Sequence, residues 1–328
     1  MRLTANPGYW NRRRGPRLQE VVLRNDLPRD EALGLVCDAE GEVDLLTGIL
    51  PAEAARVEGS AHAQLVAADE VRVLVGIIDR DATDVPLADR RARRALNLAV
   101  DRTRLVEEAF RGYAQPLSGL IPPAPATLAH RAPDRLRPYP HDPARAAALW
   151  RDAGAGSGSG LALRIAAPEH LAPAAGRVAA DLEAALGLRT ELTLLDPAEQ
   201  AATRRALAER VRPRPWHVLL WEHVAQEVDA PPHELHRGFA GADGEYRAGP
   251  EVPELDRRLA RLVAAISPAK QVLASAQIDR LVRAEALALF LCSPQKLYAV
   301  NREVRFKAYA TSFELAETEV TRRHWSRR

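Results

Sequence analysis

The sequence of 328 residues contains few cysteine, methionine and aromatic side chains. Its two cysteines, Cys37 and Cys292, lie far apart, and Cys292 lies within an apolar run, so buried free thiols are expected ahead of a disulfide. The first ten residues contain no apolar segment after a basic start, so no secretory signal peptide is visible in this chain. No stretch approaches the roughly 20 consecutive apolar residues that a membrane-spanning helix requires.

The sequence also lacks an excess of one charge and the common catalytic motifs. Its 46 Lys and Arg nearly balance 44 Asp and Glu, and a net charge of +2 produces no long-range field that would attract nucleic acid. It contains no HExxH, no pair of CxxC motifs, no Walker A loop and no GxSxG. We therefore expect neither an enzyme nor a bound cofactor, and no nucleic acid among the partners.

The middle of the chain alternates short apolar runs with helical segments. Three ranges are typical of strands and two of helices, in the order 161–167 (strand), 172–186 (helix), 189–195 (strand), 196–211 (helix) and 216–221 (strand). Asp196 and Pro197 supply an N-cap and a first-turn proline for the second helix. Strand, helix, strand, helix, strand with short connections predicts an α/β layer structure with a mostly parallel sheet.

The rest of the chain has a similar but less regular pattern. Strands are expected at 20–24, 43–46, 71–78, 287–291 and 297–300, and helices at 29–39, 52–57, 89–100, 101–111, 142–154, 253–267 and 268–286. Asp89, Asp101 and Asp142 are the expected N-caps of three of these helices. Such a chain is long enough for a sizeable core and two folding units.

Five sequence blocks in a fixed order carry a resemblance to a known family. They are Asn6-Pro7-Gly8-Tyr9-Trp10, Gly41-Glu42-Val43-Asp44, the block from Pro86 to Arg102 that reads PLADRRARRALNLAVDR, Gly119-Leu120-Ile121-Pro122-Pro123, and the block from Tyr139 to Ala146. In this order they resemble motifs of the extracellular solute-binding proteins of family 5, the peptide and nickel receptors of ABC importers. Taken singly, each block could also serve only the scaffold, as caps, turns and an amphipathic helix.

The resemblance implies an α/β fold of the periplasmic-binding-protein class II type. It also implies one complete lobe plus an incomplete second lobe, with 1–77 as a partial lobe I, 78–298 as the ligand-binding lobe II and 299–328 as a C-terminal return to lobe I. In the family, a signal sequence and a large N-terminal stretch precede the first of these motifs, so we expect this chain to lack that portion. The expected location is the periplasm or the extracellular face, peripheral to the membrane through contact with an ABC transporter permease.

The resemblance also implies a ligand-binding segment. Peptide-binding members carry a segment similar to G-W-x-A-D-Y-x-D-P, whose first Asp pairs with the amino group of the peptide. Here Val224 stands in place of that Asp, and the residues implied for ligand binding are Trp221, Glu222, His223 and Asp229. Glu222 could supply the missing carboxylate, although a surface-facing Glu after a strand is the simpler expectation. Without that carboxylate, ordinary free-amine peptides should bind weakly, and a modified peptide or a metal chelate is the expected ligand.

A group of histidines allows a second interpretation. His223, His233 and His236 with Glu234 offer imidazole and carboxylate ligands that suit nickel or zinc, although a solvated loop is the favoured reading and no metal site is predicted. The sequence therefore predicts the substrate-binding component of an ABC importer for a small solute, either a peptide or a peptide-like molecule. A truncated remnant or interaction subunit that no longer transports is the alternative, and a metal-dependent hydrolase is the third reading.

Overall fold

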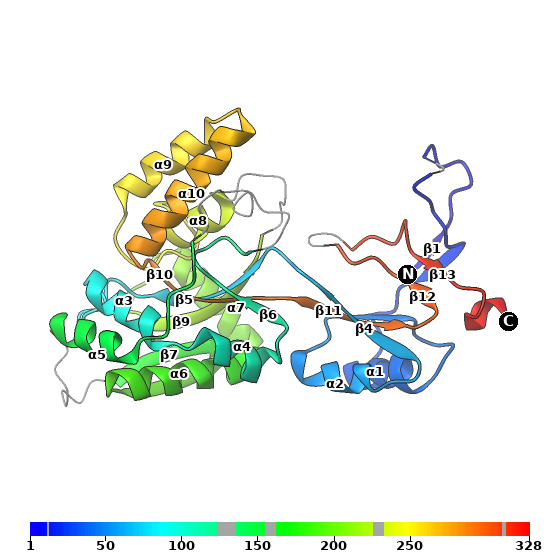
Figure 1. Ribbon diagram of the computed structural model, residues 1–328, viewed down its shortest axis with the longest axis horizontal. Coiled ribbons are helices and arrows are strands. Elements are labelled where there is room, and N and C mark those ends of the chain that lie inside the picture. The colour runs from blue at the N-terminus through cyan, green and yellow to red at the C-terminus, as the bar shows by residue number, and fades with distance from the viewer. Residues whose placement is uncertain (12, 124–135, 155–161, 226–232, 310–312) are drawn as a thin grey trace. The chain divides into compact units, whose positions relative to one another are not determined.

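A computed structural model describes residues 1–11, 13–123, 136–154, 162–225, 233–309 and 313–328 (Figure 1). The chain forms two compact units, which we call the smaller and the larger unit. The smaller unit contains Met1–Glu70 and Gln295–Arg328, and the larger unit contains Val71–Pro294. Both units combine helices with strands, so the predicted α/β class is confirmed.

In its described residues, the larger unit is built on a six-stranded sheet with the order β6-β10-β5-β9-β7-β8. The strands are β5 (Arg72–Ile78), β6 (Ala114–Pro116), β7 (Ala162–Pro168), β8 (Arg189–Leu195), β9 (Val218–Val224) and β10 (Ala288–Pro294). The predicted parallel pairing holds for β8, β7 and β9, but β5 and β10 pair antiparallel with their neighbours. The sheet is mixed because β5 and β10 come from outside the strand-helix-strand run, where no crossover helix requires parallel pairing.

Two groups of helices lie on opposite sides of this sheet (Figure 1). One group packs together below it and consists of α3 (Arg90–Ala99), α4 (Arg102–Phe110), α5 (Pro143–Asp152) and α6 (Ala172–Leu186). The other group consists of α8 (His233–Ala240), α9 (Pro253–Val263) and α10 (Pro268–Ala284), while α7 (Pro197–Ala208) follows β8. Asp89, Asp101, Asp142 and Asp196 cap their helices as predicted, because each carboxylate accepts a hydrogen bond from a backbone N–H of the first turn.

The smaller unit has a three-stranded antiparallel sheet, β3-β11-β4, in its described residues. Its elements are β1 (Arg2–Thr4), β2 (Glu20–Val22), α1 (Arg29–Asp38), β3 (Leu45–Thr47), η1 (Pro51–Glu53), α2 (Ala54–Glu58), β4 (Ala63–Ala68), β11 (Lys296–Asn301), β12 (Val304–Arg305), β13 (Glu319–Val320) and η4 (Trp325–Arg327). The sequence does not predict β4, because three of its six residues are alanine and its pattern is weak. Six residues of β4 pair with β11, so tertiary pairing makes this segment a strand.

The two units meet the predicted lobe boundaries only approximately. β5 (Arg72–Ile78) lies at the centre of the larger sheet, whereas the sequence places residues up to 77 in a partial lobe I. β11 (Lys296–Asn301) pairs with β3 and β4 in the smaller unit, although the sequence places residues up to 298 in lobe II. Both shifts arise because strand partners distant in sequence decide which unit a strand joins. The identification of the units with lobes I and II stays a prediction.

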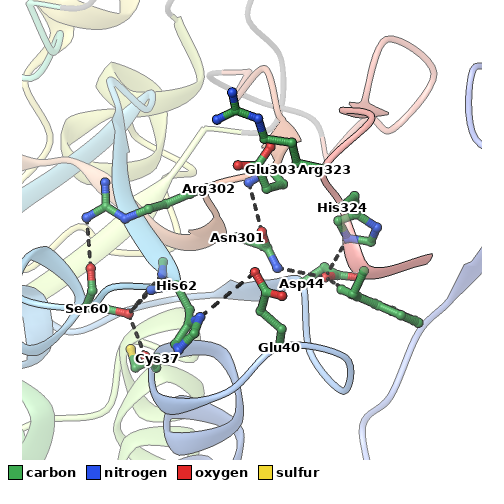
Figure 2. A network of polar contacts seen from close by, with 12 residues as sticks. Cys37, Glu40, Asp44, Ser60, His62, Asn301, Arg302, Glu303, Arg323 and His324 are labelled. Atoms are coloured by element: carbon green, nitrogen blue, oxygen red, sulfur yellow. Dashed lines mark hydrogen bonds and ion pairs between the residues drawn. The ribbon is translucent and has the colours of Figure 1, made fainter. Parts of the chain in front are cut away.

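Asp44, the last residue of the Gly-Glu-x-Asp segment, holds the end of the chain in the smaller unit (Figure 2). Among the described residues, its Oδ1 accepts hydrogen bonds from Nδ2 of Asn301 at 3.3 Å, Nε2 of His324 at 2.9 Å and Nε1 of Trp325 at 2.8 Å. The ring of His324 is buried, so the carboxylate satisfies a donor that water cannot reach. The motif residue thus has a structural role in this chain.

We expect Asp44→Ala to lower the free energy of unfolding of the smaller unit by about 1–3 kcal/mol, because it leaves the buried His324 donor unpaired. The C-terminal segment should also lose protection against hydrogen exchange. Denaturant unfolding combined with exchange measured by mass spectrometry over residues 321–328 tests both effects. Asp26→Ala is the matched control, since Asp26 is exposed and its side chain pairs with its near neighbour Arg24. Equal behaviour of the two variants would contradict the role of Asp44.

Candidate functional site

The carboxyl ends of β7, β9 and β10 and the amino ends of β5 and β6 lie at one edge of the larger sheet. The strand registers place Arg72 opposite Val224, and Pro294 opposite Ala114. β5 begins and β10 ends at this edge, next to the residues where the chain passes from one unit to the other. In α/β sheets, ligands bind outside the carboxyl ends of strands, so this edge is the candidate site.

Trp221 and His223 project from one face of β9 into an aromatic cluster. Their partners are Tyr246, whose ring centroid lies 6.0 Å from that of Trp221 and 5.3 Å from that of His223, and Phe239 of α8 at 6.1 Å from His223. Nε2 of His223 lies 3.1 Å from Oε1 of Glu234, and Nδ1 lies 3.3 Å from the Tyr246 hydroxyl. Since a carboxylate can only accept, Nε2 carries the proton and Nδ1 accepts from the tyrosine in the neutral ring.

Burial decides what these aromatic residues can do. Trp221 is 9% exposed, and burial raises the pKa of Tyr246 above its ordinary value. Trp221 therefore supports the site from within the core. His223 is partly exposed near the edge, and both of its ring nitrogens already have partners in Glu234 and Tyr246. The sequence does not predict a part for Tyr246, because 23 residues separate it from His223.

Glu222 points to the opposite face of β9. Its Oε2 lies 3.2 Å from Nη1 of Arg72 on the neighbouring strand and 3.4 Å from Nε2 of His170, in η3 (Glu169–Leu171) just after β7. The Glu222 side chain is 16% exposed and the Arg72 side chain 27%, so the ion pair is half withdrawn from water at the sheet edge. The expectation of a solvated surface Glu is wrong, since this carboxylate lies in a strand and faces two basic side chains.

The four residues implied for ligand binding are therefore not one contiguous surface. Strand alternation separates Glu222 from Trp221 and His223, and Asp229 lies outside the described residues. Val224 ends β9 opposite Arg72, so a cation stands beside the position where the resemblance implied an Asp. The sequence gives no hint of Arg72 or His170 as partners of Glu222, because 150 and 52 residues separate them from it.

The histidines that suggested a metal do not form a cluster. Within the described residues, no group of three or more His, Cys, Asp or Glu side chains could hold a metal ion. His236 is fully buried in α8, where Nε2 lies 3.0 Å from Oδ1 of Asp279 on α10, so the solvated-loop interpretation is wrong for this residue. Oδ1 of Asp279 also accepts the backbone N–H of Leu120 at 3.0 Å. This pair joins α8, α10 and the Gly119–Leu120 turn, and its role is structural.

The contact of Asp279 with the Gly119–Leu120 turn explains why a glycine stands at position 119. A Cβ at Gly119 would lie 2.3 Å from Oδ1 of Asp279, and that carboxylate is held by His236 and Leu120. We expect Gly119→Ala to lower the free energy of unfolding of the larger unit by about 1–3 kcal/mol. Gly176→Ala in α6 is the control, because open space surrounds Gly176, and it should raise stability by about 0.5–1 kcal/mol. Urea denaturation of both variants measures the difference, and a neutral Gly119→Ala would contradict this account.

The family model for bacterial extracellular solute-binding proteins, family 5 Middle, matches residues 1–232. The chain therefore belongs to this family, and the predicted family is confirmed. The glutathione-binding protein GsiB of Salmonella typhi is 27% identical over 195 residues, which cover 60% of this chain and 36% of that protein. The matched region thus amounts to about a third of the length of this curated relative.

Solved structures share the fold. The substrate-binding protein CtaP of Listeria monocytogenes gives a TM-score of 0.79 at 17% identity, covering 93% of this chain and 61% of that chain. NikA of Brucella suis, in complex with Fe(III)-EDTA, gives 0.78 at 18% identity, covering 98% and 65%. DppA of Helicobacter pylori, in complex with the peptide STSA, gives 0.73 at 17%, covering 97% and 60%. These likenesses confirm the class II periplasmic-binding-protein fold.

Two further observations concern the setting of the protein. The matched family consists of extracellular binding proteins, and the relatives above are binding proteins rather than enzymes. In the part of the chain that the structure describes, none of the helices combines the length and the apolar character needed to cross a bilayer.

Proposed function

We propose that this protein binds a small peptide-like solute that carries both an ammonium and a carboxylate, and presents it to the permease of an ABC importer. The observation that carries this proposal is the ion pair between Glu222 and Arg72 at the edge of the larger sheet. Solute binding itself follows from family membership, and relatives bind glutathione and peptides.

A half-buried ion pair favours a zwitterion over a simple amine. If a ligand ammonium bonds to Glu222, it competes with Arg72 and His170 for that carboxylate, and the partly buried guanidinium of Arg72 loses its ion pair with Glu222. A ligand that also brings a carboxylate can pair with Arg72, and two charge-assisted contacts then replace one. The site should therefore require both charges of the ligand together.

The loss of the family's Asp at Val224 fits this arrangement. Glu222 supplies a carboxylate two residues earlier in the strand, and Arg72 lies directly opposite Val224. In the proposal, Glu222 and Arg72 contact the ligand. On the other face of β9, His223 bonds to Glu234 and Tyr246, and Trp221 packs on Tyr246, so both side chains hold the end of the strand in place. Asp229 belongs to the proposed site by resemblance alone.

Thermal shift with blocked ligands tests the ligand class. Glutathione and a free dipeptide at about 100 times their dissociation constants should stabilise the larger unit by about 2.7 kcal/mol, or roughly 5–10 °C in melting temperature. N-acetylated or C-terminally amidated forms should bind at least tenfold more weakly, because each leaves one member of the ion pair unmatched. Equal shifts from free and blocked forms would contradict recognition of a zwitterion.

Two variants test which side chain binds the ammonium of the ligand and which binds its carboxylate. Glu222→Gln should weaken binding of the free dipeptide at least tenfold but leave binding of the N-acetylated form nearly unchanged. Arg72→Gln should likewise weaken binding of the free dipeptide but leave binding of the C-terminally amidated form nearly unchanged. Glu191→Gln is the control, since exposed Glu191 of β8 pairs with Arg189 of the same strand. If both variants bind free dipeptides as the wild type does, Glu222 and Arg72 are not the ligand site.

A further inference from the structure

The helical hairpin formed by α9 and α10 ends in an exposed apolar tip. Ile266, between the two helices, is 95% exposed; Val263, the last residue of α9, is 66% exposed, and Leu273, in the second turn of α10, is 54% exposed. Figure 1 shows the hairpin, in yellow and orange, extending away from the sheet of its own unit. The buried residues Leu255, Leu259, Leu262, Ile278 and Val282 account for the packed side of the two helices. The apolar residues of the tip therefore add nothing to the core.

The segment that forms this tip carries charge of one sign. The segment from Arg257 to Ile278 contains no Asp or Glu. Arg257 and Arg258 bond to Glu254 nearer the base of the hairpin. Arg261 and Lys270 are exposed and form no ion pair with the described residues. Two unpaired cations thus flank three exposed apolar side chains.

We propose that this tip docks onto an anionic lipid surface. At a bilayer, apolar side chains enter the boundary between headgroups and acyl chains, while Lys and Arg stay at the level of the phosphates and attract anionic lipid. The apolar contact comes from Ile266, Val263 and Leu273. The ionic contact with the lipid phosphates comes from Arg261 and Lys270. Attachment of this kind would hold the receptor beside the membrane in which a permease lies.

The shape and charge of the tip disfavour two other occupants. A stable protein partner typically covers about 800 Å² on each side, whereas a hairpin end with three apolar side chains is small. A second copy of this chain, docked tip to tip, would place Arg261 and Lys270 of both copies against each other without an acidic partner. A lipid surface needs neither a large area nor a matching acidic side chain.

Vesicle sedimentation with the full 328-residue chain tests the proposal. The chain should bind vesicles of phosphatidylglycerol and phosphatidylcholine more tightly than vesicles of phosphatidylcholine alone, and salt should weaken the binding. Arg261→Gln and Lys270→Gln should each reduce the partition coefficient about fivefold, and Ile266→Ser should reduce it about tenfold. Leu192→Ser and Arg145→Gln, which alter exposed residues of other elements, should leave it unchanged.

Three results would overturn the proposal. One is equal binding to anionic and neutral vesicles, another is the absence of binding, and the third is an equal effect of tip and control variants. A concentration-dependent dimer that Ile266→Ser abolishes, without lipid binding, would instead assign the tip to a second copy of the chain. Unchanged melting temperatures of the variants show that they fold. Lipid binding and the thermal shift with dipeptides are separate readouts, so either proposal can fail alone.

Discussion

The larger unit depends on hydrogen bonds from side chains to the part of β10 that its neighbour β6 does not reach. β6 pairs with β10 over Cys292–Pro294, and the N–H of Leu117 donates to the carbonyl of Leu291, but the backbone groups of Ala288 and Phe290 on this side lie beyond that pairing. The side chain of Asn97 accepts the N–H of Phe290 at 3.1 Å and donates to the carbonyl of Ala288 at 3.0 Å, and Arg102 donates to the carbonyl of Phe290 at 2.7 Å. Two side chains therefore take the place of a strand, which keeps a buried sheet edge satisfied.

This arrangement gives a physical reason for the long block from Pro86 to Arg102. Arg93 donates to the carbonyls of Leu87, Ala88, Glu285 and Ala286, and Arg102 also bonds to Asn97. Burial lowers the pKa of Arg102 to about 10, which still leaves it charged at neutral pH and able to donate from every N–H. Within this block, Arg93, Asn97 and Arg102 thus join α3 and α4 to β10 and to the residues just before it.

The candidate site, unlike the helix caps, is assembled from residues distant in sequence. Glu222, Arg72 and His170 come from three separate segments and meet because β5 begins, and β9 and β7 end, at one sheet edge. Strand alternation then sends Trp221 and His223 to the α8 face, where Tyr246 and Phe239 surround the histidine. A short run of neighbouring residues therefore contributes to two distinct surfaces. The chemistry at each surface is decided by partners that are distant in sequence.

The sequence by itself determined the family, the α/β class and most helices, because caps and periodic apolar faces act within a few residues. Asp89, Asp101, Asp142 and Asp196 cap helices where local spacing requires it. Only the tertiary structure decided that the sheet is mixed, that β4 is a strand, and that His236 is buried against Asp279. It alone brought Arg72 and His170 to Glu222. Hydrogen bonds and ion pairs between segments separated by tens to hundreds of residues settle these points, and no local pattern encodes them.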